Sequence, residues 1–260
     1  MSDSVESVAA KRGIFLPPFD ELVEPETLSQ LAVGAEAAGW DGFFLWDHIL
    51  YRPPTEAVAD PWIALAAIAC ATRSIRIGPL VTPLARRRVQ KVARETVTLD
   101  HLSGGRLIFG VGLGGDGNGE FELFGDPADP RERAGILDQG LSRLSEYWAG
   151  EFKPEPVQQP RIPVWVAGRW PNRRPLRRAA NWDGYFPIDL TAPDDLSELA
   201  RDLAELRSGR EDPFDLVAET DPGGDPAPWE EAGATWVLTS FDIRPKLAEV
   251  RDRIEAGPAG

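Results

Sequence analysis

A glycine-rich segment is the first candidate for ligand binding in this 260-residue chain. Residues 108–120 read IFGVGLGGDGNGE, in which Gly110, Gly112 and Gly115 spell G-x-G-x-x-G. In a dinucleotide-binding fold the third glycine of this pattern opens a helix directly. Here Gly110 lies inside a predicted strand, and turn-forming residues follow Gly115 until a helix is predicted near Arg131. The pattern therefore predicts no dinucleotide fingerprint, but a loop that either connects two elements or lets a ligand approach the backbone.

The residue best suited to acid–base chemistry is His48. It follows Trp46 and Asp47 at the end of the predicted strand Gly42–Trp46. An imidazole ordinarily exchanges its proton near neutral pH, so this position favours a proton relay, with a loop histidine bonded to backbone as the alternative. The other histidine, His101, is predicted at the end of a helix on the opposite face and is assigned a structural role.

Arginines collect where two predicted helices begin. Residues 86–88, all arginines, precede the helix predicted over Val89–Leu102. Arg169, Arg173 and Arg174 precede the helix predicted over Pro175–Ala180. Cations at a helix N-terminus oppose the helix dipole by ~0.3–1 kcal/mol each, so local stability does not explain them. The clusters indicate an anionic ligand such as a phosphorylated cofactor, with ordinary solvated charges as the alternative.

Alternating elements must position these residues. Eight apolar, β-rich runs are predicted as strands: Gly13–Leu16, Gly42–Trp46, Ile75–Val81, Arg106–Val111, Pro163–Ala167, Gly184–Pro187, Phe214–Ala218 and Thr235–Ser240. Helix-like segments separate most of them: Glu26–Ala38, Pro61–Ala71, Val89–Leu102, Arg131–Trp148, Pro175–Ala180, Pro193–Arg207 and a short one at Trp229–Gly233, with Arg244–Glu255 closing the chain.

Eight βα units in a chain of this length are typical of a TIM (βα)8 barrel, for which ~250 residues is usual. An open doubly wound sheet alternates in the same way, and the count of eight together with the length favours the barrel. In the barrel both arginine clusters and His48 lie at the carboxyl ends of the strands, where active sites are built. We expect one domain over residues 13–256, with flexible ends at 1–12 and 257–260.

Composition excludes several classes of partner. The formal net charge of −14 disfavours nucleic acid and anionic membranes. The longest apolar stretch, residues 62–71, is shorter than the ~20 residues of a membrane span, and the first residues carry no apolar signal core. The single cysteine, Cys70, fits a reducing cytoplasm and is expected to be buried in that stretch. With two histidines and no metal-ligand motif, no metal site is expected.

These segments together resemble the luciferase-like family of flavin- and deazaflavin-dependent oxidoreductases. The D-H-L-S-G-G-R-L block followed by G-V-G is its most specific piece. The resemblance is carried by AEAAGWDGFFLWDH (35–48), IRIGPLVTPL (75–84), VARETVTLDHLSGGRLIFGVGLGG (92–115), EFELFG (120–125), PVWVAGRWPNRRPLRRAANWDGYFP (163–187) and EAGATWVL (231–238).

The resemblance implies a TIM barrel that holds FMN or the deazaflavin coenzyme F420 at the carboxyl ends of its strands. A strand bulge behind the tricyclic ring is implied at Leu80, Val81 and Thr82. Close approach to the cofactor is implied at Gly112 and Gly114, and further cofactor contacts, including the phosphate, at Gly168, Arg169 and Trp170.

Beside the ring, the resemblance implies Trp46 as a cofactor contact and His48 as a catalytic residue, with Asp47 as the second catalytic candidate. In deazaflavin-using relatives the corresponding histidine is a proposed proton acceptor. At two positions this sequence departs from the family's pattern, so sugar-phosphate oxidation is in doubt and light emission is not implied. The candidate general-acid glutamate of a deazaflavin-using sugar-phosphate dehydrogenase corresponds to Gly115, beside Asp116, and the arginine of bacterial luciferase corresponds to Ile108.

The sequence thus predicts a cytoplasmic oxidoreductase that uses reduced FMN or F420 on a small organic substrate, by hydride transfer or monooxygenation. The alternative is a non-catalytic flavin-binding barrel. The resemblance implies a homodimer, and no nucleic-acid or membrane partner is expected.

Overall fold

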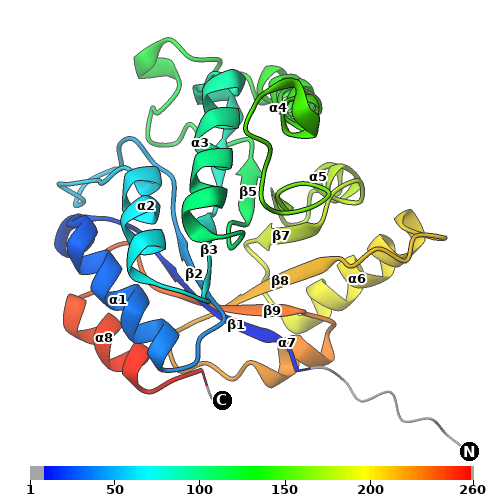
Figure 1. Ribbon diagram of the computed structural model, residues 1–260. Helices are drawn as coiled ribbons and strands as arrows, with labels where there is room; N and C mark the ends of the chain where they lie inside the picture. Colours follow the sequence, from blue (N-terminus) through cyan, green and yellow to red (C-terminus); the bar gives the residue numbers. More distant parts are fainter. Residues whose placement is uncertain (1–8, 259–260) are drawn as a thin grey trace, which may run out of the picture.

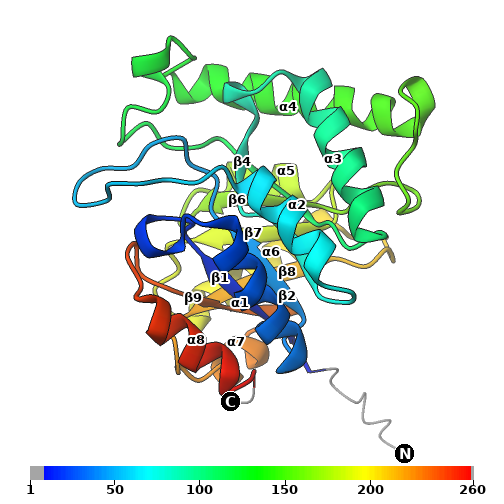
Figure 2. The same cartoon turned by 60° about the vertical axis from the view of Figure 1, so that its left-hand side comes forward.

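A computed structural model describes residues 9–258. Nine parallel strands form one sheet in the order β3-β2-β1-β9-β8-β7-β6-β5-β4. They are β1 (Lys11–Leu16), β2 (Gly42–Leu45), β3 (Arg76–Pro79), β4 (Thr82–Pro83), β5 (Phe109–Gly112), β6 (Val164–Arg169), β7 (Gly184–Ile188), β8 (Asp215–Thr220) and β9 (Trp236–Ser240). The helices surround these strands (Figures 1 and 2).

The ring of strands closes where β3 meets the start of the β5 segment. A parallel bridge joins Ile77 to Leu107, and the Ile108 amide donates to the Ile77 carbonyl at 2.8 Å. The architecture is therefore a TIM barrel, as the sequence predicted. The nine strands correspond to the eight predicted ones because the third, predicted over Ile75–Val81, is divided into β3 and β4.

The break in the third strand lies at Leu80 and Val81, which are joined by a cis peptide bond. Before it, β3 pairs with β2, and after it, β4 pairs with β5. Pro79 and Pro83 have no N–H to give to a ladder, which limits regular pairing on both sides of the break. The bulge expected at Leu80–Thr82 is present at this break.

Within the described residues, eight α-helices follow the predicted segments closely. They are α1 (Pro25–Ala37), α2 (Pro61–Ala71), α3 (Val89–Ser103), α4 (Pro130–Glu146), α5 (Arg174–Ala179), α6 (Pro193–Leu206), α7 (Ala227–Glu231) and α8 (Leu247–Glu255). No helix begins at Gly115, and Gly110 lies within β5, so the G-x-G-x-x-G pattern is a false match to a dinucleotide fingerprint. Among residues 9–258, no helix has both the length and the apolar character needed to cross a membrane.

Two apolar layers meet at the strands. Side chains pointing into the barrel form the inner layer: Phe15, Phe44, Leu80, Ile108, Trp165, Ala167, Phe186, Val217, Trp236 and Leu238. A larger outer layer fills the space between strands and helices. The alternation of strand side chains produces both layers, so the parity of a residue in its strand decides which layer it joins.

Two sequence expectations about position are corrected. β1 begins at Lys11 rather than Gly13, while the flexible ends predicted for 1–12 and 257–260 lie largely outside the described residues. Cys70 is exposed, although it lies in the apolar segment of α2. The side chain falls on the outward face of the helix, which an almost uniformly apolar run does not distinguish from the inward face.

Closure of the barrel depends on the missing side chain of Gly78. A Cβ there would clash with the backbone carbonyl of Ile108, across the junction between β3 and β5. We expect Gly78→Ala to lower the free energy of unfolding by about 2–3 kcal/mol, because backbone on both sides must shift. Thermal denaturation followed by circular dichroism should show Tm lower by roughly 5–10 °C.

Gly135→Ala is the matched control. Gly135 lies in α4, and a Cβ there meets nothing within 4 Å. This variant should gain up to about 1 kcal/mol, since alanine is the better helix former. Equal Tm values for the two variants would contradict the steric account of closure.

Candidate functional site

Residues from several strand ends meet at the carboxyl face of the barrel. Trp46, Asp47 and His48 follow β2 directly, and the loop after β5 brings Glu120 to them. Arg86 and Arg87 follow β4 and enter the same region. In a TIM barrel this face carries the active site, so this is the candidate site.

His48 is held by Glu120. Its Nδ1 lies 2.7 Å from Oε2 of Glu120, 72 residues further along the chain. An ionised carboxylate only accepts hydrogen bonds, so Nδ1–H is the donor and Nε2 is the ring nitrogen that Glu120 leaves unengaged. The rings of Trp46 and Tyr51 flank the imidazole at 6.0 and 5.0 Å. The ring is thus fixed in orientation and tautomer, as an acid–base residue requires.

Glu120 is itself buried and charged. It accepts from the Ile49 amide at 2.8 Å and pairs with Arg86, and 1% of its surface is exposed. Burial opposes its ionisation, but the hydrogen bond and charge of His48, the charge of Arg86 and the Ile49 amide outweigh burial and hold the pKa of Glu120 below its ordinary value. The sequence analysis did not select Glu120, although the EFELFG motif contains it.

Asp47 points into the wall of the site. Its carboxylate accepts from Thr82 Oγ1 at 2.7 Å, from Trp62 Nε1 at 3.2 Å and from Arg87 Nη2 at 2.9 Å. None of its side-chain surface is exposed. The carboxylate therefore ties the end of β2 to β4 and to the arginines that follow β4.

Two arginines of the first cluster, Arg86 and Arg87, are explained by these internal acids. Arg86 pairs with both Asp47 and Glu120, and Arg87 pairs with Asp47. The side chain of Arg86 is 3% exposed. The predicted anionic partner of these two arginines is therefore supplied by the protein.

The three residues of the predicted strand bulge, Leu80, Val81 and Thr82, lie in two different surroundings. Leu80 belongs to the inner layer of the barrel, and Val81 packs against that layer while partly exposed. Thr82 is fully buried, and its hydroxyl donates to Asp47. Leu80 and Val81 face the interior, whereas Thr82 anchors the bulge from behind.

The predicted glycines allow close packing of protein against protein. A Cβ on Gly112 would lie 2.7 Å from Val81 Cγ2. Gly114 has a φ of 68°, and a Cβ there would lie 2.8 Å from the Phe121 ring. The loop after β5 therefore folds tightly onto the bulge.

The predicted phosphate contacts lie at the end of β6. Gly168 allows α5 to pack closely, because a Cβ there would clash with Pro175. Arg169 pairs with Asp189, yet 70% of the arginine side chain is exposed. Trp170 packs against the guanidinium of Arg173 at 4.4 Å. An exposed ion pair is worth little, so Asp189 holds Arg169 only weakly.

A cavity of about 640 Å³ opens at the carboxyl face, lined by Trp46, Asp221, Ser240, Phe241, Ile243 and Arg244 among others. Its volume is in the range of small-molecule sites. Trp46 Nε1 is buried and has no hydrogen-bond partner among the described residues, so a donor is free for a ligand. The rings of Phe15 and Phe186 lie 5.6 Å apart in the inner layer of the barrel. The lining combines the aromatic side chains of Trp46 and Phe241 with charged ones, which include Asp242 and Glu249.

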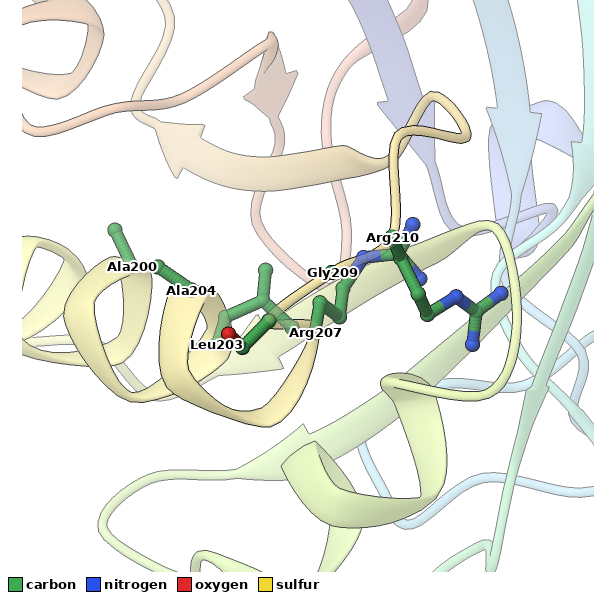
Figure 3. A pocket seen from close by; sticks show the side chains of 7 residues that line it. Ala200, Leu203, Ala204, Arg207, Gly209 and Arg210 are labelled. Carbon is green, nitrogen blue, oxygen red and sulfur yellow. The ribbon is translucent and has the colours of Figure 1, made fainter.

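A second hollow of about 400 Å³ lies at the C-terminal end of α6 (Figure 3). Helices of a barrel return to the amino ends of the strands, so this hollow is remote from the candidate site. Arg207 and Arg210, which line it, both pair with Asp212. Their charges are thus already compensated, and we assign this hollow no function. Within residues 9–258, no group of three or more His, Cys, Asp or Glu side chains has an arrangement suited to a metal ion.

Comparison with known proteins gives the family. The luciferase-like monooxygenase family matches residues 11–221. An uncharacterised protein of Mycobacterium tuberculosis is 33% identical over 208 residues, which are 71% of this chain and 70% of that protein. An F420-dependent glucose-6-phosphate dehydrogenase of Nakamurella multipartita is 28% identical over 217 residues, or 75% of this chain and 62% of that protein.

Solved structures share the fold. The coenzyme F420-dependent tetrahydromethanopterin reductase of Methanopyrus kandleri superimposes with a TM-score of 0.77 at 18% identity, covering 95% of this chain and 97% of that one. The oxygenating constituent of 3,6-diketocamphane monooxygenase of Pseudomonas putida, solved with FMN, gives a TM-score of 0.68 at 17% identity over 82% and 67% of the two chains.

This chain belongs to the luciferase-like monooxygenase family and is an oxidoreductase. The family, the barrel and the enzyme class expected from the sequence are confirmed. The non-catalytic alternative is not favoured, because the relatives with named functions are dehydrogenases, a ketoreductase and monooxygenases.

Replacing Glu120 should reveal how strongly the buried charges depend on it. We expect Glu120→Gln to lower the free energy of unfolding by about 2–4 kcal/mol at pH 7, because Arg86 loses its charged partner in a buried place. The native pKa of Glu120 is lowered, so its contribution is complete above its ordinary pKa of 4.5 and is lost as the pH falls through the native value.

Urea denaturation of the wild type and the variant between pH 3 and 8 measures this difference. The gap between the two proteins should be constant above about pH 5 and shrink below it. The exposed Glu122 is the control, since Glu122→Gln should change stability by less than about 0.5 kcal/mol at any pH. Equal stability of Glu120→Gln and the wild type at pH 7 would refute the role of the pair.

Proposed function

We propose that this protein transfers a hydride between the deazaflavin coenzyme F420 and a small alcohol or carbonyl substrate. The observation that carries the proposal is the oriented pair of His48 and Glu120 beside Trp46, which lines the cavity at the carboxyl face. Alcohol oxidation and carbonyl reduction need a proton acceptor or donor at the substrate oxygen, and a fixed imidazole meets that need. The relatives named as F420-dependent support this choice of coenzyme over FMN.

The residues of the chain divide the work. The space for the tricyclic ring would be bordered by Trp46, Leu80 and Val81. The phosphate would be bound by Arg169, next to Gly168 and Trp170. Gly112 and Gly114 keep the loop after β5 close to the bulge. The coenzyme, when bound, accepts or supplies the hydride. All other chemistry in this proposal is performed by protein side chains.

His48 takes the proton of the substrate hydroxyl at Nε2, because Nδ1 is engaged by Glu120. The carboxylate then stabilises the imidazolium that forms, as a buried acid does for a catalytic histidine. Asp47 acts by position. It holds Thr82 and the arginines, and Arg86 in turn holds Glu120.

The proposal also covers the binding partners and the cellular location of the protein. A net charge of −14 supports the absence of a nucleic-acid partner, and the single cysteine supports a cytoplasmic enzyme. The homodimer implied by the family resemblance remains part of the proposal. It is tested by light scattering of the purified protein.

Direct titration distinguishes the coenzymes. We expect F420 to bind at least ~10-fold more tightly than FMN, an advantage of ~1.4 kcal/mol. Quenching of coenzyme fluorescence, in the oxidised and the reduced forms, provides the measurement. Exclusive binding of reduced FMN, with oxygen consumption, would replace hydride transfer by monooxygenation.

Removing the imidazole should stop the chemistry while leaving coenzyme binding. We expect His48→Ala to lower kcat by ~10²–10⁴-fold, the usual contribution of a positioned acid or base. Coenzyme affinity should change little, and the pH profile of kcat should lose one limb. The measurement is the reduction of F420 with a panel of secondary alcohols.

His101→Ala is the matched control. His101 is exposed, and among the described residues its side chain bonds only the Glu155 carbonyl, so its loss should leave kcat unchanged. Intact turnover in His48→Ala would make His48 a structural loop residue. Collapse of coenzyme binding instead would place His48 in the ring pocket.

A further inference from the structure

A buried arginine near the start of α4 has no acidic partner. Only 4% of the surface of Arg133 is exposed. Its Nη1 donates to the Ala128 carbonyl at 2.8 Å, and its Nε is buried without a hydrogen-bond partner. Among residues 9–258 it forms no ion pair. Burial of an uncompensated charge is costly, and an apolar side chain would fill the same space without that cost. Packing alone therefore does not account for a guanidinium here.

The guanidinium of Arg133 lies against an aromatic ring. Its Cζ is 4.4 Å from the centroid of the Phe121 ring, and Phe121 is fully buried. Arg86 approaches the same ring, with its Cζ at 5.7 Å. A cation within ~6 Å of a ring centroid is attracted to the ring, more strongly where water is excluded. Arg133 thus reaches from α4 to a ring that also contacts the charged cluster.

Phe121 anchors the loop between β5 and α4. Its amide donates to Oδ1 of Asp116 at 2.8 Å, and its carbonyl accepts from the Asp126 amide at 2.9 Å. Arg133 holds the same loop at two points, through the Phe121 ring and through the carbonyl of Ala128. Long loops of this kind are mobile unless other parts of the fold hold them. The two contacts of Arg133 therefore act as a clamp on the loop.

The residue before Phe121 is Glu120, whose carboxylate lies 2.7 Å from Nδ1 of His48. A shift of the Phe121 ring moves the adjoining backbone, and a hydrogen bond weakens steeply as its geometry departs from ideal. We infer that Arg133 is a positioning residue of the proposed reaction, which holds Glu120 on His48 by clamping the loop. The inference rests on the proposed function. His48 then keeps its proton on Nδ1, and Nε2 stays available for the proton of the substrate.

The first test needs neither coenzyme nor substrate. The chain has two histidines, so nitrogen-15 NMR of the imidazoles is readily assigned. His101 supplies an internal reference, because its Nε2 lies 2.7 Å from the Glu155 carbonyl, which only accepts, and its proton is therefore on Nε2. At about pH 9, where an ordinary imidazole is neutral, we expect His48 of the wild type to carry its proton on Nδ1.

Arg133→Met should raise the ratio of Nε2–H to Nδ1–H in His48 by roughly 5–10-fold, the effect of weakening one hydrogen bond. Arg133→Lys should stay near the wild type, because it keeps a charge for the ring and a donor for Ala128. Arg131→Met is the matched control, since Arg131 is exposed two residues earlier in the same helix. An unchanged ratio in Arg133→Met overturns the inference. If that variant does not fold, Arg133→Gln, which removes the charge and keeps a donor, is judged by the same ratio.

The second test separates positioning from binding. Arg133→Met should lower kcat for F420 reduction by ~10–100-fold while the Kd of F420 changes less than about threefold, because a small misplacement of a catalytic group slows chemistry more than binding. Arg133→Lys should restore most of kcat. Weaker F420 binding with an intact kcat overturns the positioning role, because Arg133 would then serve the coenzyme. If the wild type does not reduce F420, the proposed function falls, and the ratio of tautomers still decides whether Arg133 holds Glu120 on His48.

Discussion

The ion-paired cluster of Asp47, Arg86, Arg87 and Glu120 is the interaction on which the site depends. Two carboxylates and two guanidiniums alternate there, from the end of β2, the segment after β4 and the loop after β5. Unpaired charges in such a place would carry a large desolvation cost, so each arginine fixes a loop as firmly as a packed side chain does. His48 inherits its orientation from this cluster through Glu120.

Closure of the barrel supplies the second constraint. The backbone of β3 comes so close to the start of β5 that a side chain at Gly78 has no room, and the strand then breaks at Leu80 and Val81. The break turns Val81 toward the inner layer and leaves Thr82 within reach of Asp47. The hydrogen bond from Thr82 to Asp47 therefore joins the break in the strand to the charged cluster.

Two glutamates of the same barrel face have opposite electrostatic surroundings. Glu120 is surrounded by donors and a guanidinium, which keep it ionised in spite of burial. Glu219 has a hydroxyl and a like charge nearby, so burial prevails and its proton is held to near neutral pH. The two environments therefore separate the pKa values of the two acids, and only Glu120 contacts His48.

The sequence by itself determined the barrel and its elements to within a few residues, because hydrophobic periodicity is a local signal, and the resemblance of its motifs indicated the family. It also placed His48 and Trp46 at the carboxyl face. Only the tertiary structure joined His48 to Glu120 and exposed Cys70, and only it assigned Arg86 and Arg87 to internal acids rather than to a ligand. These outcomes depend on which side chains meet in the folded barrel. The number of residues between two positions in the sequence does not reveal whether their side chains meet.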